Sequence, residues 1–171
     1  MPRVPRFSAH ATIGVALVVG RASVRSLATP MVRVTTQITI ARDIDDVFSY
    51  FADLRNEPAW NRGHVRHVVM TTPGPIGRGT AFVGDHPGFG TATWRITDFV
   101  RPSRIAIEGE VGSGTYRYVG ELTPLQGATR FLGTVEWRPG GFLRSLSPLL
   151  TPILKFQARR SFTNLKNELE R

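Results

Sequence analysis

The chain has 171 residues, of which 41% are hydrophobic and 20% are charged, a composition typical of an ordinary globular protein. Residues 31–171 have the length of one domain that can bury a sizeable core, so a second domain is not expected. The absence of cysteine excludes a disulfide scaffold, a thiolate zinc site and a cysteine nucleophile.

The formal net charge of +9 raises the question of nucleic-acid binding. Four of these charges come from arginines within residues 1–30, which contain no acid. Among the 22 cationic residues only Lys155 and Lys166 are lysines, a bias typical of a GC-rich genome, and the arginines of the domain are scattered singly. We therefore interpret the basic residues as a solvated surface and expect no nucleic-acid partner.

Residues 1–30 combine a basic start, an apolar stretch and a Ser-Leu-Ala sequence before Thr29, which together partly resemble a secretory signal. The apolar stretch is too short to span a bilayer, and two arginines separate it from the candidate cleavage site. We interpret residues 1–30 as an N-terminal extension that is disordered or missing from the native product, with Met31 as the true start. This interpretation predicts a cytoplasmic protein; the alternative is export, if these residues are a signal segment.

The first elements of the domain follow from the spacing of its apolar residues. Residues 32–40 alternate between apolar and polar side chains, which predicts a half-buried strand. Asp43 then supplies the carboxylate expected of a helix N-cap. Apolar residues at helical spacing form one face of that helix: Ile44, Val47, Phe48, Phe51 and Leu54. Asn56-Glu57-Pro58 ends the helix, and Trp60 lies in a short segment of one or two turns.

From residue 65 onward the sequence predicts six further strands. They cover residues 65–71, 80–83, 91–100, 104–111, 114–122 and 128–137. The short connections between them indicate an antiparallel meander. Two loops rich in glycine and proline, 73–79 and 84–90, are expected at the mouth of any pocket that the sheet encloses.

The chain ends in a predicted amphipathic helix that extends to about Glu170. Its start is left open between Ser147-Pro148 and Thr151-Pro152, where a cap residue precedes proline. An apolar stripe runs along it at steps of three and four residues: Leu150, Leu154, Ala158, Phe162, Leu165 and Leu169.

These elements predict an α+β fold in which a seven-stranded curved antiparallel sheet wraps around the last helix. Only that helix is long enough to cover the sheet, and the twist of a sheet prevents close contact along the whole helix. A tapered apolar pocket between sheet and helix is therefore expected.

Several sequences in this order resemble the START-like, or Bet v 1-like, helix-grip superfamily, and within it the bacterial polyketide cyclase/dehydrase-type lipid-binding (SRPBCC) branch. They are IARDIDDVFSYFAD at 40–53 with Trp60 seven residues later, GPIGRGT at 74–80, Pro139-Gly140-Gly141, and FTNLKNELE at 162–170. The resemblance covers about residues 32–170 and implies two short helices after the first strand. It is specific for the fold but not for the function, because the superfamily carries binders, transporters and enzymes on one scaffold.

Apolar and aromatic residues are expected to line the predicted pocket, because sites for apolar ligands have mostly apolar walls with a few polar groups. The predicted ligand-binding residues are Trp60, His64, Phe82, Trp94, Tyr116, Phe131, Leu154, Phe156 and Ala158. For any single aromatic residue an ordinary core position is the favoured alternative, whereas the set as a whole favours a cavity.

Three residues are candidates for catalysis if the pocket belongs to an enzyme. His86, on loop 84–90, is an acid–base candidate near neutral pH, with an exposed loop histidine as the favoured alternative. Tyr116 or Arg95 would orient the substrate. For Arg95, as for Glu108 and Arg117, cross-strand ion pairing on the convex face of the sheet is the favoured alternative.

No metal site or cofactor is expected. His64 and His67 straddle the start of the second predicted strand, and a spacing of three residues in a strand places side chains on opposite faces, so they cannot share a metal ion.

The favoured hypothesis is a binding module for a hydrophobic small molecule or lipid, present as a monomer or weak dimer without stable membrane insertion. The alternative is a polyketide cyclase/dehydratase-like enzyme that uses the same cavity. A third hypothesis, a basic domain directed at acidic lipid or RNA, is disfavoured by the low lysine content and the scattered arginines.

Overall fold

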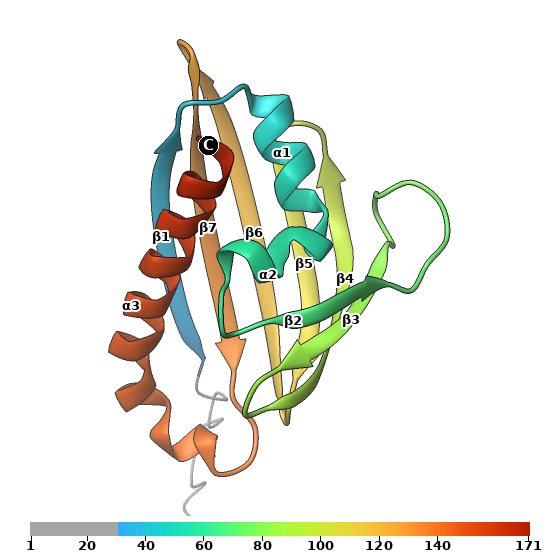
Figure 1. Cartoon of the computed structure of the whole chain (residues 1–171). Helices are drawn as coiled ribbons and strands as arrows, with labels where there is room; N and C mark the ends of the chain where they lie inside the picture. The colour runs from blue at the N-terminus through green and yellow to red at the C-terminus, as the bar shows by residue number, and fades with distance from the viewer. Residues whose placement is uncertain (1–30) are drawn as a thin grey trace, which may run out of the picture.

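The computed structural model describes residues 31–171, apart from the side chains of Leu143 and residues 146–148. The interpretation of residues 1–30 lies outside the described residues. In chain order the elements are β1 (Val32–Ile40), α1 (Ile44–Ala52), the 3-10 turn η1 (Leu54–Asn56), α2 (Glu57–Trp60), β2 (Arg66–Met70), β3 (Ala81–His86), β4 (Gly90–Val100), β5 (Arg104–Val111), β6 (Gly114–Leu125), β7 (Ala128–Arg138) and α3 (Leu143–Leu169). The predicted α+β helix-grip fold is confirmed (Figure 1).

The seven strands form one antiparallel sheet in the order β1-β7-β6-β5-β4-β3-β2. Strands β2 to β7 form the predicted meander, and β1 pairs with β7 from Val32 opposite Trp137 to Ile40 opposite Thr129. Figure 1 shows α3 running beside β1 and β7, while α1 and α2 lie over the neighbouring strands. The expectation that α3 alone covers the sheet was therefore wrong, because Phe51 and Trp60 of the short helices are buried in the same core.

Helix α1 forms where the sequence predicts it. Asp43 caps it, since its Oδ1 accepts a hydrogen bond from the Asp45 amide at 2.9 Å. The carboxylates of Asp45 and Asp46 in the first turn interact favourably with the positive end of the helix dipole. Its buried face includes Val47, Phe48 and Phe51.

Helix α3 begins at Leu143, before both predicted starts. Its first turn is closed by hydrogen bonds between residues three apart, from Ser145 to Phe142 and from Arg144 to Gly141. No side chain caps the helix at Phe142, so the local signal on which the prediction depended is missing there. Pro148 and Pro152 consequently lie within the bounds of the helix.

The core is densely packed under the C-terminal half of α3. The Phe131 ring of β7 contacts the Phe51 ring at a centroid distance of 4.8 Å and the Phe162 ring of α3 at 5.4 Å. Leu165, one turn further along α3, is fully buried. The apolar stripe predicted for the last helix therefore faces the sheet.

Polar contacts hold the same end of α3 in place. The Lys166 ammonium donates to the Thr39 carbonyl at 2.7 Å, and the Ala41 amide donates to Glu170 Oε1 at 2.6 Å. Asn164 Nδ2 donates to the Trp60 carbonyl at 3.0 Å, which joins α3 to α2. The last three turns of α3 are thus tied to the sheet and to the short helices.

The two predicted mouth loops lie at opposite ends of the β2–β3 hairpin. The turn after His86 reaches the pocket described below, whereas no residue of loop 73–79 does. Figure 1 shows the β2–β3 loop at the sheet edge far from α3. The expectation for loop 73–79 was therefore wrong. Within residues 31–171, none of the helices combines the length and the apolar character needed to cross a membrane.

Gly133 of β7 makes the close approach of α3 possible. A Cβ atom added there would overlap the Phe162 ring and would lie 2.5 Å from the Tyr118 hydroxyl oxygen. We predict that Gly133→Ala lowers the free energy of unfolding by about 1–3 kcal/mol, because a packed core cannot accept the extra carbon without moving the ring.

Chemical denaturation measures this loss. Gly77→Ala is the matched control, because nothing lies within 4 Å of a Cβ atom added at Gly77. Equal stability of the Gly133 and Gly77 variants would contradict the conclusion that Gly133 makes room for the Phe162 ring of α3.

Candidate ligand pocket

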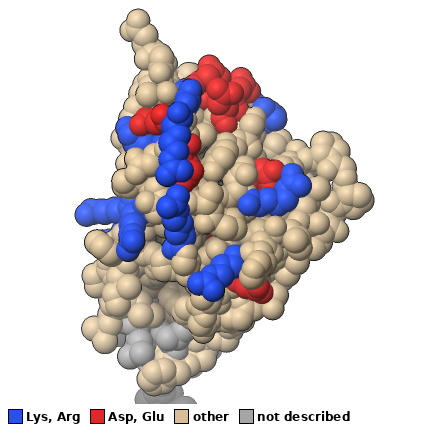
Figure 2. All heavy atoms as spheres, viewed as in Figure 1, with Lys and Arg blue, Asp and Glu red and all other residues tan. Residues whose placement is uncertain are grey.

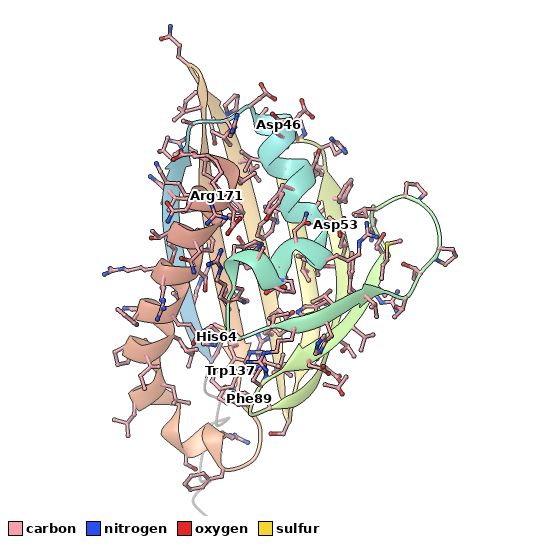
Figure 3. All side chains as sticks on the ribbon, in the orientation of Figure 1. Asp46, Asp53, His64, Phe89, Trp137 and Arg171 are labelled. Atoms are coloured by element: carbon pink, nitrogen blue, oxygen red, sulfur yellow. The ribbon has the colours of Figure 1, made fainter. Side chains whose placement is uncertain are left out.

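A pocket of about 450 Å³ lies between the inner face of the sheet and the N-terminal half of α3. The pocket begins where the dense core ends along the apolar stripe of α3. Leu150, Leu154 and Ala158 border the pocket, whereas Leu165 is fully buried in the core. Figure 3 shows His64, Phe89 and Trp137, which also line it, gathered toward the end of the sheet where α3 starts. The pocket thus forms because α3 packs closely against the sheet at its C-terminal end and lies further from the sheet toward its N-terminal end.

Most of the predicted binding residues meet at this pocket. Trp60, His64, Trp94, Tyr116, Leu154 and Ala158 line it, as does the catalytic candidate His86. They come from α2, the segment before β2, and from β3, β4, β6 and α3, so residues far apart in the sequence share one surface.

Four predicted residues lie elsewhere. Phe82 and Phe131 are buried in the solid core and do not border the pocket. Phe156 is 70% exposed, because two helical steps from Leu154 turn it about 200° away from the pocket. Arg95 follows the buried Trp94 on β4 and therefore points to the outer face, where its guanidinium donates to the Gly79 carbonyl at 3.1 Å.

The outer face of the sheet carries the cross-strand ion pairs expected from the sequence. Arg117 of β6 lies opposite Glu108 of β5, with 3.3 Å between Nε and Oε1. Arg33 of β1 likewise lies opposite Glu136 of β7, with 3.7 Å between the charged groups. These charges stabilise the exposed face and do not reach the pocket.

Basic residues lie outside the pocket. None of the described residues that line it is Lys or Arg, whereas Lys155, Arg159 and Arg160 are exposed on α3. Figure 2 shows Lys and Arg side chains gathered over α3 on this face. The only acid among the described lining residues is Glu57.

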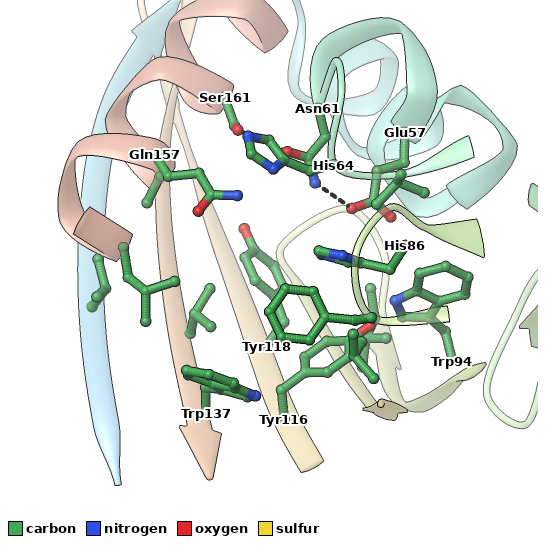
Figure 4. A pocket seen from close by; sticks show the side chains of 18 of the residues that line it. Glu57, Asn61, His64, His86, Trp94, Tyr116, Tyr118, Trp137, Gln157 and Ser161 are labelled. Atoms are coloured by element: carbon green, nitrogen blue, oxygen red, sulfur yellow. Dashed lines mark hydrogen bonds between the residues drawn. The ribbon is translucent and has the colours of Figure 1, made fainter. Parts of the chain in front are cut away.

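Glu57 was missed by the sequence analysis, which interpreted Asn56-Glu57-Pro58 only as the end of a helix. Asn61, one turn later, donates from Nδ2 to Glu57 Oε1 at 2.9 Å (Figure 4). Burial raises the pKa of Glu57 from 4.5 to about 7, against a lowering by the Asn61 hydrogen bond. The spacing of Glu57, Trp60, Asn61 and His64 is that of one helical face, and this signal could have identified the residue.

A hydrogen-bonded chain fixes this carboxyl group between two helices. Asn61 uses its Nδ2 for Glu57, and its Oδ1 accepts a hydrogen bond from Ser161 Oγ of α3 at 2.8 Å. Part of the Glu57 residue remains accessible at the pocket surface, while its carboxyl group lies deep enough for burial to dominate its pKa. The carboxyl group is therefore held in one orientation toward the pocket.

Tyr116 and Tyr118 project from the same face of β6 because they are two residues apart. Both hydroxyl oxygens are buried, and neither has a hydrogen-bond partner among the described residues. Burial, with a smaller contribution from the Glu57 carboxylate, raises the pKa of both hydroxyls well above the ordinary value. Both therefore remain protonated and able to donate a hydrogen bond.

His64 and His86 face each other with 6.4 Å between ring centroids, and the Phe89 ring packs edge-on against His86 at 5.1 Å. Burial is the main cause that lowers the pKa of each histidine; Arg160 adds to it for His64, and His64 adds to it for His86. The favoured interpretation of His86 as an exposed loop residue was wrong, because it ends β3 and lines the pocket. His67 points away and contacts Asp85 on the exposed side, with 2.8 Å between Nδ1 and Oδ2.

Acidic and histidine side chains do not gather into a metal site in the part of the chain that the structure describes. The polar side chains that line the pocket include one carboxyl group, three hydroxyls, two histidines and two amides, within mainly apolar walls. This arrangement can hold an uncharged apolar molecule and can donate hydrogen bonds to it.

An antiparallel sheet that grips a long C-terminal helix, with a pocket between them, defines a helix-grip protein of the α+β class. The chain belongs to the family described as polyketide cyclase / dehydrase and lipid transport, whose model matches residues 31–170. No curated protein sequence matches the chain significantly.

Solved structures of the Bet v 1-like and START-like fold are similar to this one. Hypothetical protein jhp0584 of Helicobacter pylori is 14% identical, with a TM-score of 0.66, over 95% of this chain and 100% of that one. TTHA0849 of Thermus thermophilus is 16% identical, with a TM-score of 0.63, over 82% and 97%. Truncated norcoclaurine synthase of Thalictrum flavum is 13% identical, with a TM-score of 0.59, over 85% and 98%. These similarities concern the fold alone.

The raised pKa of Glu57 links stability to pH. The folded state holds this proton more tightly than the unfolded chain does, so the stabilisation is complete below pH 4.5 and is lost as the pH rises through about 7. We predict that Glu57→Gln removes about 1–3 kcal/mol of the fall in unfolding free energy between pH 5 and pH 8.

Urea denaturation at a series of pH values measures this effect. The histidine contributions are common to both proteins and cancel in the comparison. Glu110→Gln, at an exposed position, is the control and should keep the wild-type pH dependence. An unchanged slope in Glu57→Gln would show that this carboxyl group titrates normally.

Proposed function

We propose that this protein binds a hydrophobic small molecule or lipid in the pocket between the sheet and α3. The observation that carries this proposal is an open pocket of about 450 Å³ with mainly apolar walls in a domain whose core is otherwise densely packed. Affinity would come chiefly from apolar burial, at roughly 25 cal/mol per Å² removed from water. No cofactor is needed for such binding.

The proposed ligand contacts are the predicted residues that the pocket brings together: Trp60, His64, Trp94, Tyr116, Leu154 and Ala158. Phe82 and Phe131 support the walls from the core behind them. Phe156 is not proposed as a contact because it is exposed outside the pocket. Native mass spectrometry of the protein isolated from its own host would identify a co-purified ligand directly.

The second candidate function is a polyketide cyclase/dehydratase-like enzyme that uses the same pocket. The favouring observation is the buried Glu57 carboxyl group with a pKa of about 7, since a group that titrates near the working pH can both take and give a proton. His86 and Tyr116 remain catalytic candidates beside it, whereas Arg95 does not, because it lies on the outer face.

A short linear poly-β-ketone distinguishes the two functions. An enzyme of this kind would convert it to a cyclised or dehydrated product, and Glu57→Gln would abolish conversion while binding persists. Binding without conversion by the wild-type protein supports the carrier function.

We propose a monomer or weak dimer that contacts no nucleic acid and does not insert stably into a membrane. The proposed location is the cytoplasm, with export as the alternative. The N-terminus of the native protein separates the two, because a start near Thr29 would indicate removal of a signal segment.

Filling the pocket should block binding. Ala158 lines the pocket, so we predict that Ala158→Phe weakens binding of the neutral dye N-phenyl-1-naphthylamine at least about tenfold, since the added ring occupies ligand space. Dye fluorescence during titration measures the dissociation constant.

Phe156→Ala is the matched control, because that side chain is 70% exposed on the other side of α3. It should leave the dissociation constant unchanged, and thermal unfolding should verify that both variants are folded. Equal dye affinity in wild type and Ala158→Phe would rule out the pocket as the binding site.

A further inference from the structure

The outer side of α3, which faces away from the sheet, carries the most exposed apolar side chains in the part of the chain that the structure describes. Four residues, Phe142, Leu149, Ile153 and Phe156, are between 61% and 77% exposed, whereas the other large hydrophobic residues described are at most 53% exposed. Leu149, Ile153 and Phe156 follow one another at steps of four and three residues, so they form one continuous stripe. A contiguous apolar stripe in water marks an interaction site, unlike single exposed residues.

Basic side chains border this stripe. Lys155 and Arg159, which are one helical turn apart, lie beside it, and Arg160 continues it one turn beyond its last apolar residue. All three are exposed, and none of the ion pairs within residues 31–171 involves them. The sequence contains no acid between Glu136 and Glu168. The four apolar residues and these three basic residues together form what we call the outer face of α3.

The outer face of α3 adjoins the mouth of the pocket. Ile153 and Phe89 are both exposed and both line the pocket, so they lie where it opens to solvent. Figure 1 shows the β3–β4 turn, which carries Phe89, at the end of the molecule where α3 begins. A surface that covered the outer face would therefore also reach the pocket opening.

The chemistry of this face favours a lipid surface over other occupants. A nucleic acid would pair with the cations but would leave the aliphatic side chains in water. A second copy would bring like charges together, since the face has no acid to pair with its cations. Residues 1–30 carry four arginines and no acid, so they meet the same repulsion. An anionic bilayer meets both requirements, because its headgroups attract Lys and Arg and its acyl boundary accepts large apolar side chains.

An acidic lipid partner was disfavoured from the sequence because the basic residues are scattered along the chain, whereas the fold gathers three of them on one helix. We propose that the outer face of α3 docks reversibly on an anionic lipid bilayer, with its apolar side chains in the headgroup region and its cations against the phosphates. The docking is peripheral, since none of the described helices can span a membrane.

Docking in this orientation brings the pocket mouth against the bilayer, which lets an apolar ligand enter without crossing water. This use of the outer face rests on the proposed function, whereas the docking itself does not. The two can therefore be tested separately.

Sedimentation with lipid vesicles tests the docking on the full chain. The protein should bind vesicles of phosphatidylcholine with about 30 mol% phosphatidylglycerol at least about tenfold more tightly than vesicles of phosphatidylcholine alone, because each cation near the surface interacts with its negative potential. Added salt should reduce this difference, since it screens exposed charges.

Apolar substitutions on the outer face should weaken this binding. The double variant Leu149→Ser with Phe156→Ser should bind the anionic vesicles at least about tenfold more weakly, because both side chains leave water only in the docked state. Val100→Ser with Leu125→Ser is the matched control and should bind as the wild type does, since both residues are exposed at the opposite end of the sheet. Neither Leu149 nor Phe156 lines the pocket, so an unchanged affinity for N-phenyl-1-naphthylamine verifies that the variant is folded.

Charge substitutions test the electrostatic part. Lys155→Gln with Arg159→Gln should weaken binding to the anionic vesicles about tenfold. Arg66→Gln with Arg130→Gln removes the same charge from exposed positions on the sheet and is the matched control. It should weaken binding less than about threefold, because these charges lie outside the docked surface.

The absence of cysteine allows a direct readout of insertion. Phe156→Cys, labelled with the environment-sensitive dye nitrobenzoxadiazole, should show brighter and blue-shifted emission on the anionic vesicles as the label leaves water. The same label on Val100→Cys is the control and should not change.

The outcomes separate the docking from the ligand function. Binding of N-phenyl-1-naphthylamine without binding to anionic vesicles overturns the docking and leaves the ligand function standing, and vesicle binding without dye binding does the reverse. Vesicle binding that persists in both α3 double variants shows that the attraction lies elsewhere in the chain and overturns the proposal. It is also overturned if Leu149→Ser with Phe156→Ser splits a dimer in solution, because a second copy then covers the face, or if RNA binds more tightly than the vesicles through the same residues.

Discussion

The contact between Phe162 of α3 and Phe131 of β7, made over Gly133, determines how the rest of the molecule is arranged. It brings the end of a long helix against a curved sheet, and Phe51 of α1 completes the aromatic cluster. Hydrogen bonds from Lys166 and to Glu170 secure the same end. Because a straight helix cannot follow a twisted sheet, close contact at this end implies separation at the other.

The pocket is the consequence of that separation, and its polar groups come from α2, α3 and the sheet. Helix α2 brings Glu57 and Asn61 to the gap, and α3 fixes them through Ser161. The sheet contributes Tyr116 and Tyr118 from one face of β6. The separation of the N-terminal half of α3 from the twisted sheet thus produces both the apolar pocket and the burial that raises the pKa of Glu57.

Local patterns were sufficient to predict the strands, the meander, α1 and the apolar stripe of α3, because each depends on the spacing of nearby residues. The start of α3 was not predictable in this way, since it has no capping side chain and the prolines suggested later starts. Trp60, Trp94 and Tyr116, which were predicted to contact a ligand, all line the pocket, whereas Phe156 is exposed because its position along the helix turns it away from the sheet. Glu57 was missed because Asn56-Glu57-Pro58 was interpreted only as the end of a helix, although the spacing of Glu57 from Trp60 and His64 is that of one helical face. The burial that raises its pKa depends on the fold and could not be predicted from that spacing.

All three tryptophans of the chain, Trp60, Trp94 and Trp137, line the pocket, which allows a direct test of its occupancy. The measurement is tryptophan emission during titration with N-phenyl-1-naphthylamine, whose absorption overlaps that emission. We expect tryptophan emission to be quenched in step with the rise of dye fluorescence, and both signals to saturate at one dye per protein. A rise in dye fluorescence without tryptophan quenching, or no binding at all, would contradict this expectation.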